Sequence, residues 1–331
     1  MMTEGLTIRF RLFTLQALLA VCGFGFCIAA VAQNFPNAPM RIISPYPPGG
    51  GTDILARAIG QRLTERFGLA VVVENRAGAN GTVGAGIAAK APPDGHTLVI
   101  VAAGYAAGAS LYKNLPYDQA RDLAPVSQLA AGPLVLVVHP SLPVYSVNEL
   151  AALARARPGE LNAGNSGTGS LPHLSAELFA TMSGIKLVHI PYKGPGLALI
   201  DVMSGQVPLY FMNVLGALPL VKAGKLRALG VSSAERSAIA PELPTIAETG
   251  LRGFDMTNWY GMLAPGATPK DVIAKLQQEI ARIMALPDVK QLMAAGGMTI
   301  VASTPPRFTE FLTRESDKYA RVIRAAGVKP E

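Results

Sequence analysis

Two glycine-rich turns are the segments of this sequence that point most directly to chemistry. The first, PYPPGGGTD, covers residues 45–53, and the second, NAGNSGTGSLPH, covers residues 162–173. In both, strand-forming residues precede the glycines and a helical pattern follows them. Glycine lets the backbone approach a ligand closely, and the first amide N–H groups of a helix have no acceptor within it. Turns of this kind are typical of sites that bind an anion.

The known nucleotide and hydrolase patterns do not fit these turns. A phosphate loop needs a lysine followed by serine or threonine after its second glycine, and neither turn has that lysine. The dinucleotide pattern GxGxxG fails because Ile54 and Pro172 stand where the third glycine belongs. Ser166 lies in GNSGT, which departs from the nucleophile elbow GxSxG at Thr168. The turns therefore predict binding, with no catalytic residue.

The sequence predicts neither a metal nor a cofactor. The histidines are far apart along the chain and form no HExxH pattern. A site assembled by folding stays open, but each histidine alone favours a structural role. Both cysteines precede residue 33, which excludes thiolate chemistry from the rest of the chain. These residues are Cys22, Cys27, His96, His139, His173 and His189.

The expected ligand contacts come from the two turns and the residues beside them. Asp53 has two interpretations, a cap of the following helix or a ligand contact, and the cap is favoured because a carboxylate repels an anion. Tyr46 forms a wall of the site or part of the core, and His173 faces the ligand or is structural. The candidate residues are Tyr46, Gly49, Gly50, Gly51, Thr52, Asp53, Asn165, Ser166, Gly167, Thr168, Gly169, Ser170 and His173.

The N-terminal segment has the pattern of a secretory signal peptide. Arg9 and Arg11 precede an apolar stretch that ends Ala30-Val31-Ala32, a small-residue cleavage motif. We expect residues 1–32 to be removed and the protein to be periplasmic. The alternative is an uncleaved membrane anchor, because the apolar stretch is nearly long enough to cross a bilayer.

The charge of the chain predicts a small anionic partner more readily than a nucleic acid. The formal net charge is +7, and +6 without residues 1–32, but the basic residues are scattered singly. A single tryptophan, Trp259, offers no platform for stacking bases. A positive field that attracts small anions and a surface charge that serves only solubility are both compatible with this composition.

Alternating strand and helix patterns place the two turns in an α/β fold. Short β-branched runs such as 41–45, 70–74 and 97–101 alternate with amphipathic stretches such as 54–67 and 147–157. This alternation predicts mainly parallel sheets covered by helices. Two further segments, 125–138 and 259–265, read as extended chain with no helix close behind, and we interpret them as crossings between two lobes. The expected lobes are residues 34–130 plus 252–331, and residues 131–251.

Longer motifs resemble those of a known family. The segments PYPPGGGTD, VVVENRAGANGTVGA, NSGTGSLPHL, PYKGPG and KAGKLRALGVSSAERS resemble the Bug (TctC-type) extracytoplasmic solute receptors of tripartite tricarboxylate transporters. The resemblance covers essentially the whole chain after the N-terminal segment.

The resemblance implies a type-2 periplasmic binding-protein fold, in which two α/β lobes with two crossover strands at the hinge close on a ligand. It implies no catalysis, and ligands that are small carboxylates or amino acids. We expect no cofactor, and a monomer whose partners are a mono-, di- or tricarboxylate and the membrane subunits of a transporter. By this analogy residues 46–53 and 165–170 are the binding loops. A sensory receptor with a signalling partner and a secreted hydrolase are the alternatives.

One departure from the family pattern bears on the ligand. Many members have an Asp-Leu-Met-Phe-Asp-Asn run where this chain reads PLYFMN at residues 208–213. If Met212 lines the site, the missing carboxylate disfavours ligands that carry an ammonium group. We therefore expect a carboxylate without an amine, aromatic or aliphatic.

Overall fold

The computed structural model describes residues 35–328, except for the side chain of Leu215. The chain divides into two units, residues 1–37 and residues 38–331, and the fold described below belongs to the second. The predicted signal peptide, residues 1–32, lies outside the described residues.

The first glycine turn follows a buried parallel strand, as the sequence predicts. Strand β1 (Met40–Ser44) pairs in parallel with β2 (Val71–Asn75) on one side and with β3 (Thr97–Ala102) on the other. Helix α2 (Gly51–Phe67) begins at the third glycine, three residues before the predicted start. Helix α3 (Thr82–Ala89) connects β2 to β3, after the short helix η1 (Ala79–Gly81). Two short helices, η2 (Ala103–Ala107) and α4 (Gly108–Leu111), follow β3.

The second glycine turn has the same setting in the middle of the chain. Strand β5 (Asn162–Asn165) pairs in parallel with β6 (Val188–Pro191) and with β7 (Leu209–Asn213). The glycines after β5 lead into α6 (Leu171–Ser183), which has proline in its first turn. The remaining elements of this region are α5 (Val147–Ala156), α7 (Pro195–Met203), α8 (Val214–Lys222) and β8 (Arg227–Val231).

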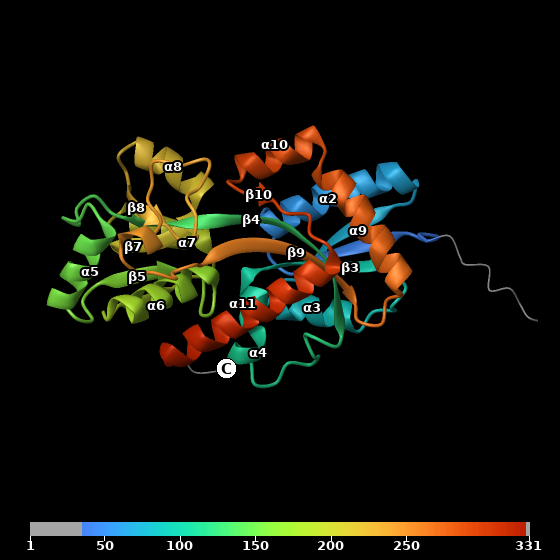
Figure 1. Ribbon diagram of the computed structural model, residues 1–331, viewed down its shortest axis with the longest axis horizontal. Helices are drawn as coiled ribbons and strands as arrows, with labels where there is room; N and C mark the ends of the chain where they lie inside the picture. The colour runs from blue at the N-terminus through green and yellow to red at the C-terminus, as the bar shows by residue number, and fades with distance from the viewer. Residues whose placement is uncertain (1–34, 329–331) are drawn as a thin grey trace, which may run out of the picture. The chain divides into compact units, whose positions relative to one another are not determined.

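Two long antiparallel strands join these two regions into one sheet. Strand β4 (Leu123–Val138) pairs through residues 123–133 with β9 (Thr257–Pro265), through residues 134–138 with β7, and through residues 135–138 with β8. The strands lie in the order β2-β1-β3-β9-β4-β7-β5-β6, with β8 and β10 (Thr299–Ile300) also on β4. Figure 1 shows β4 and β9 running between the two sets of helices. These are the two segments that the sequence predicts as crossings.

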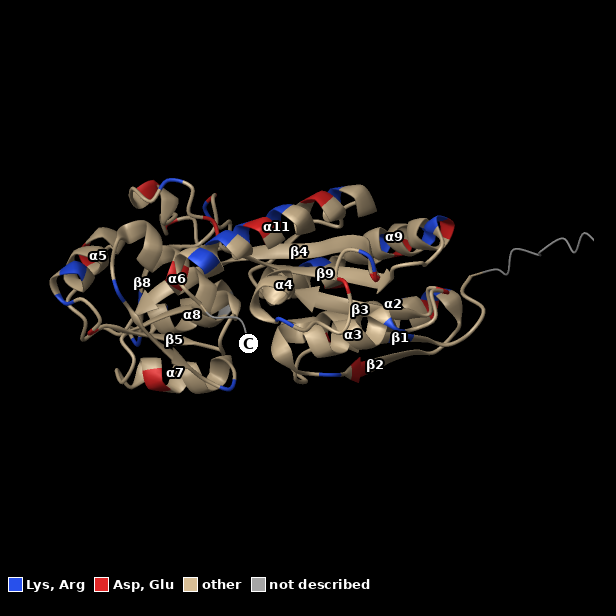
Figure 2. Cartoon of the chain, turned by 90° about the horizontal axis from the view of Figure 1, so that it is seen from below, with Lys and Arg blue, Asp and Glu red and all other residues tan. Residues whose placement is uncertain are grey.

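The C-terminal helices cover the long strands. Helices α9 (Lys270–Met284), α10 (Pro287–Ala295) and α11 (Pro305–Ala325) complete the chain, and α11 contacts β4, η2 and α6. Charged residues of both signs are interspersed along α9 and α11 (Figure 2), so neither helix presents a run of one charge. Burial of strand residues such as Ile42, Ile43 and Val99, none of which is exposed, supplies the apolar core.

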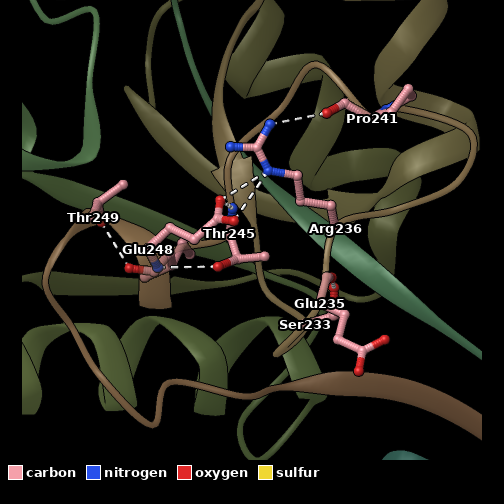
Figure 3. A network of polar contacts seen from close by, with 8 residues as sticks. Ser233, Glu235, Arg236, Pro241, Thr245, Glu248 and Thr249 are labelled. Atoms are coloured by element: carbon pink, nitrogen blue, oxygen red, sulfur yellow. Dashed lines mark hydrogen bonds and ion pairs between the residues drawn. The ribbon is translucent and has the colours of Figure 1, made fainter.

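Polar contacts hold the long connection between β8 and β9 in place. Arg236 donates to the carboxylate of Glu248 at 3.0 and 3.1 Å and to the carbonyl oxygen of Pro241 at 3.1 Å (Figure 3). Glu248 and Thr245 each accept a hydrogen bond from the backbone N–H of the other, which is a capping box. These contacts add to the burial of apolar residues such as Ile246 and Phe254 of the same connection, so their role is structural.

Candidate functional site

A cavity of about 810 Å³ lies between residues of the two regions. The turn after β1, the start of η1 and the end of β3 border it on one side, and the turns after β5, β6 and β7 border it on the other. Strands β4 and β9 and the α10–β10 segment supply the rest of its wall. Four of the predicted contacts line this cavity, and they are Tyr46, Gly51, Ser166 and Ser170.

The first glycine turn contributes Tyr46 and Gly51 to the cavity. The hydroxyl of Tyr46 donates to the carbonyl oxygen of Asn80 at 2.9 Å. Burial, and then the neighbouring Tyr260, raise the pKa of Tyr46 above its ordinary value, so the hydroxyl stays protonated and can donate. Gly51 is the first residue of α2, and its amide has no acceptor among the described residues. Tyr260 of β9 lies against this glycine.

The other predicted residues of the first turn do not line the cavity. Gly49 and Gly50 lie in the turn outside the lining, and the hydroxyl of Thr52 is within 3.0 Å of that of Ser44. Asp53 accepts hydrogen bonds from the amide of Gly49 at 3.0 Å and from the side chains of Asn75 and Arg57 at 2.9 and 3.1 Å. The carboxylate therefore holds the turn in shape from the first turn of α2, whose N-cap residue is Gly50 and has no side-chain cap.

We expect Asp53→Asn to lower the free energy of unfolding by about 1–2 kcal/mol at pH 7. Hydrogen bonds from Arg57, Gly49 and Asn75 outweigh the effect of burial and lower the pKa of Asp53 below its ordinary 3.8. Because the pKa of Asp53 is lower in the folded state than in the unfolded state, its ionised carboxylate stabilises the fold at pH values above the unfolded-state pKa. This stabilisation is lost as the pH falls through the folded-state pKa.

Urea denaturation at pH 7 and at pH 3 measures both effects. The difference between wild type and Asp53→Asn is expected to shrink at pH 3, and the exposed Asp317→Asn serves as the control. An undiminished difference at pH 3 would contradict the ionic role of Asp53.

The second glycine turn contributes Ser166 and Ser170. The side chain of Ser166 hydrogen-bonds that of Tyr210, whose pKa is raised by burial. Asn165 is buried and accepts from the amide of Gly167 at 3.0 Å, so it shapes the turn. Gly167 and Gly169 have φ of +122° and +73°, a conformation that glycine adopts at little cost. Neither of them, nor Asn165, lines the cavity.

Ser170 is a hydrogen-bonding group without a partner at the start of α6. It precedes the helix and lines the cavity, and only 7% of it is exposed. Its hydroxyl has no hydrogen-bond partner among the described residues. The amides of Leu171 and His173 in the first helical turn also have no acceptor there. A buried hydroxyl without a partner is costly, so this arrangement favours a polar ligand atom at Ser170.

Contacts beside the cavity link the two glycine turns through Asn80. The side-chain amide of Asn80, in η1, donates to the carbonyl oxygen of Thr168 at 2.9 Å. Asn80 has a φ of +50°, which is uncommon for a residue with a side chain. A Cβ on Gly169 would overlap Leu111, so only glycine allows this close approach. The two regions are therefore in direct contact beside the cavity, with Thr168 and Gly169 in that contact.

His173 lies behind the second turn instead of in the cavity lining. Its Nδ1 accepts from the amide of Gly169 at 3.0 Å, and its Nε2 lies 3.4 Å from Oε1 of Glu177. The Nε2 of His189 lies 3.2 Å from the same oxygen. Burial opposes ionisation of Glu177, but hydrogen bonds from His173 and His189 lower its pKa to about 2. This network holds the second glycine turn in place. His173 therefore has a structural role, which is one of the two roles that the sequence allowed.

The same three side chains are close enough together to suggest a metal site. However, a ring nitrogen that accepts a hydrogen bond has no proton, so the proton of a neutral His173 ring is on Nε2. That proton points to Glu177 and leaves Nε2 no lone pair for a cation. The geometry therefore favours an anchor for the turn over a metal centre.

The sequence reading missed a second group of lining residues. Lys193, Gly194, Pro195 and Gly196 at the start of α7 line the cavity, and so does the start of α8 at Asn213 and Gly216. Glycine followed by proline, and asparagine before an apolar run, are both signals of a helix start. These signals were present in the sequence, but nothing in them shows that both helices begin at the same cavity.

The fold and the cavity define a two-lobed solute-binding protein. Comparison with known families gives a more specific assignment, because residues 55–328 match the family described as tripartite tricarboxylate transporter family receptor. The chain belongs to this family, which consists of solute-binding receptors and not of enzymes. The predicted fold class and family resemblance are thereby confirmed.

Individual relatives agree with this assignment. Protein BugT of Bordetella pertussis is 38% identical over 319 residues, which cover 94% of this chain and 98% of BugT. Rpa4515 of R. palustris, solved with adipate, is 36% identical with a TM-score of 0.81, covering 90% of this chain and all of that one. MatC of Rhodopseudomonas palustris, solved with bound malate, is 29% identical with a TM-score of 0.77, covering 87% of this chain and all of MatC.

The membrane-anchor alternative concerns the N-terminal segment, which is outside the described residues. Within residues 35–328, none of the helices combines the length and the apolar character that crossing a bilayer requires.

Proposed function

We propose that this protein is an exported receptor that binds a small carboxylate between its two lobes and delivers it to a tripartite tricarboxylate-type membrane transporter. Residues 1–32 act as a signal peptide that directs the chain to the periplasm. The lobes are residues 34–130 plus 252–331, and residues 131–251. Closure of the lobes on the ligand presents a distinct conformation to the transporter.

The buried hydroxyl of Ser170 at the start of α6 carries this proposal. A ligand carboxylate placed there accepts from the hydroxyl and from the free amides of the first helical turn. The helix dipole adds about 0.3–1 kcal/mol to the binding of a negative group at this end. The structural relatives solved with adipate and malate support a carboxylate as the ligand class.

The charges around the cavity support the same ligand class. Among the described residues, Lys193 is the one charged side chain that lines the cavity, and no carboxylate does. The nearby Asp53 is already bonded to Arg57, Asn75 and the amide of Gly49. An anion therefore meets hydrogen-bond donors and one cation, without a repelling charge in the lining.

We expect Ser170→Ala to weaken binding of adipate or malate by about tenfold or more, because a hydrogen bond to a charged group contributes about 1.5–3 kcal/mol. Isothermal titration calorimetry measures the change. Ser183→Ala is the matched control, since Ser183 lies on the same helix and is also buried without a side-chain partner, but does not line the cavity.

Two further observations test the wider proposal. Mass spectrometry of material released from the native protein by unfolding is expected to find an organic acid, and acids of this class should raise the midpoint of thermal unfolding. A midpoint that no carboxylate changes, with no acid released, would refute the receptor function. Loss of acid uptake when the membrane subunits are deleted tests delivery to the transporter.

A further inference from the structure

One side of the cavity is built from apolar side chains that the two binding turns do not include. Met212 of β7 and Met293 of α10 are 7% and 6% exposed, and both line the cavity. Met298, just before β10, packs its Sδ against Gly132 of β4, where a Cβ would lie 2.8 Å from the sulfur. With Leu134 and Leu292, these residues form what we call the methionine wall.

The methionine wall and the polar donors come from different elements. The donors belong to the starts of α2 and α6, whereas the wall belongs to β4, β7, α10 and the residues before β10. A ligand that contacts both the polar donors and the methionine wall has an acid group at one end and an apolar body at the other. Thioether side chains are flexible and adapt to apolar bodies of different shape.

The lining of the cavity, in the part of the chain that the structure describes, offers no carboxylate to a ligand ammonium group. Its lining among the described residues contains no aspartate or glutamate, and Met212 occupies the position that the sequence singled out. Burying an ammonium group without a counter-charge costs several kcal/mol, which is more than a neutral acceptor such as the Ser166 hydroxyl offsets. The volume of about 810 Å³ lies in the upper part of the ~300–1,000 Å³ range of small-molecule pockets, which leaves room for a body longer than four carbons.

We propose that this cavity selects an amine-free carboxylate with an apolar body of about six or more carbons, its acid group at the start of α6 and its body on the methionine wall. This inference rests on the proposed function and names the ligand class within it. Two effects determine the specificity for the ligand. The apolar body of the ligand is buried against the methionines, and ligands that carry an ammonium group are excluded.

Calorimetric titration with a matched series of acids tests both terms. From butyrate through hexanoate to octanoate, affinity is expected to rise about fourfold per methylene, because each buried CH₂ contributes about 0.8 kcal/mol. Hexanoate should bind at least 100-fold more tightly than 6-aminohexanoate, which has the same body with an ammonium group.

Two substitutions locate these effects. Met298→Gln is expected to flatten the dependence on chain length, while Met182→Gln, a half-buried methionine outside the cavity, leaves it unchanged. Met212→Asp is expected to reverse the preference between hexanoate and 6-aminohexanoate, and a circular-dichroism spectrum shows whether this variant folds.

The outcomes separate this inference from the proposed function. If butyrate and 6-aminohexanoate bind as tightly as hexanoate, the ligand class is wrong while the receptor function stands. A flat chain-length dependence in the wild type overturns the methionine wall in the same way. If no carboxylate of the series, and neither adipate nor malate, binds, the proposed function itself fails.

Discussion

Gly51→Ala is expected to weaken binding of hexanoate by about 100-fold and to lower the free energy of unfolding by about 1–3 kcal/mol. A Cβ at this position would overlap the hydroxyl of Tyr260 and lie 2.6 Å from its Cζ. Tyr260 lines the cavity from β9, so displacing its ring changes the wall beside the first glycine turn. The substitution also moves the free amide at the start of α2.

The neighbouring glycine is a matched control for this prediction. A Cβ on Gly50 would lie 3.4 Å from the carbonyl oxygen of Pro47, and its φ of −75° suits any residue. Gly50→Ala is therefore expected to change affinity less than threefold. Equal losses for the two variants would show that the turn needs glycine for another reason.

A double-mutant cycle with Tyr260→Ala tests the mechanism. When the ring is absent, adding Gly51→Ala is expected to cost little further affinity, because nothing remains to be displaced. Additive losses would mean that Gly51 acts independently of Tyr260. Titration calorimetry with hexanoate and urea denaturation measure affinity and stability for the four proteins.

Local patterns in the sequence predicted the two turns because their signals lie within a few residues. Strand formers before the glycines and a helical pattern after them place one helix start near Ser170, where the structure has it. They place the other at Ile54, three residues after its observed start at Gly51. Gly51 and Ser170 both line the cavity. Local signals also favoured a cap for Asp53, since a carboxylate at a helix start accepts nearby amides.

The sequence could not show which residues the folded chain brings together over long distances. Gly51 is close to Tyr260, which lies more than 200 residues later in the chain. The sequence of the turn does not predict this contact. The methionine wall combines β4 and β7 with α10, whose helical pattern gives only its own buried face. His173 and His189 likewise meet only because β6 lies beside β5. Such contacts follow from topology, which local periodicity leaves undetermined.

Trp259→Ala is expected to lower the free energy of unfolding by about 3–5 kcal/mol, which is the usual range for removing a large buried aromatic side chain. Trp259 has no exposed surface, and its ring meets Phe308 and Phe311 of α11 with centroid distances of 6.1 and 5.4 Å. From its position on β9 it packs against α11 and so helps to hold this helix on the long strands.

A hydrogen bond adds to this packing. The indole N–H of Trp259 donates to Oε2 of Glu315 at 3.1 Å, and Lys318 lies 2.6 Å from Oε1 of the same carboxylate. Glu315 is only 6% exposed, so loss of the indole leaves one oxygen of a buried carboxylate without its donor. Trp259→Phe keeps most of the packing and removes the donor, which separates the two contributions.

Stability measurements on Trp259→Phe, Glu315→Gln and the double variant decide whether the hydrogen bond matters. We expect a coupling energy of about 1 kcal/mol, whereas additive effects would assign the whole loss to packing. Trp259 is the single tryptophan of the chain, so unfolding is followed by circular dichroism instead of tryptophan fluorescence. Because Trp259 does not line the cavity, Trp259→Phe is expected to keep its affinity for hexanoate within threefold of wild type. A larger loss would mean that the packing of α11 on the crossing strands also controls how the lobes close on the ligand.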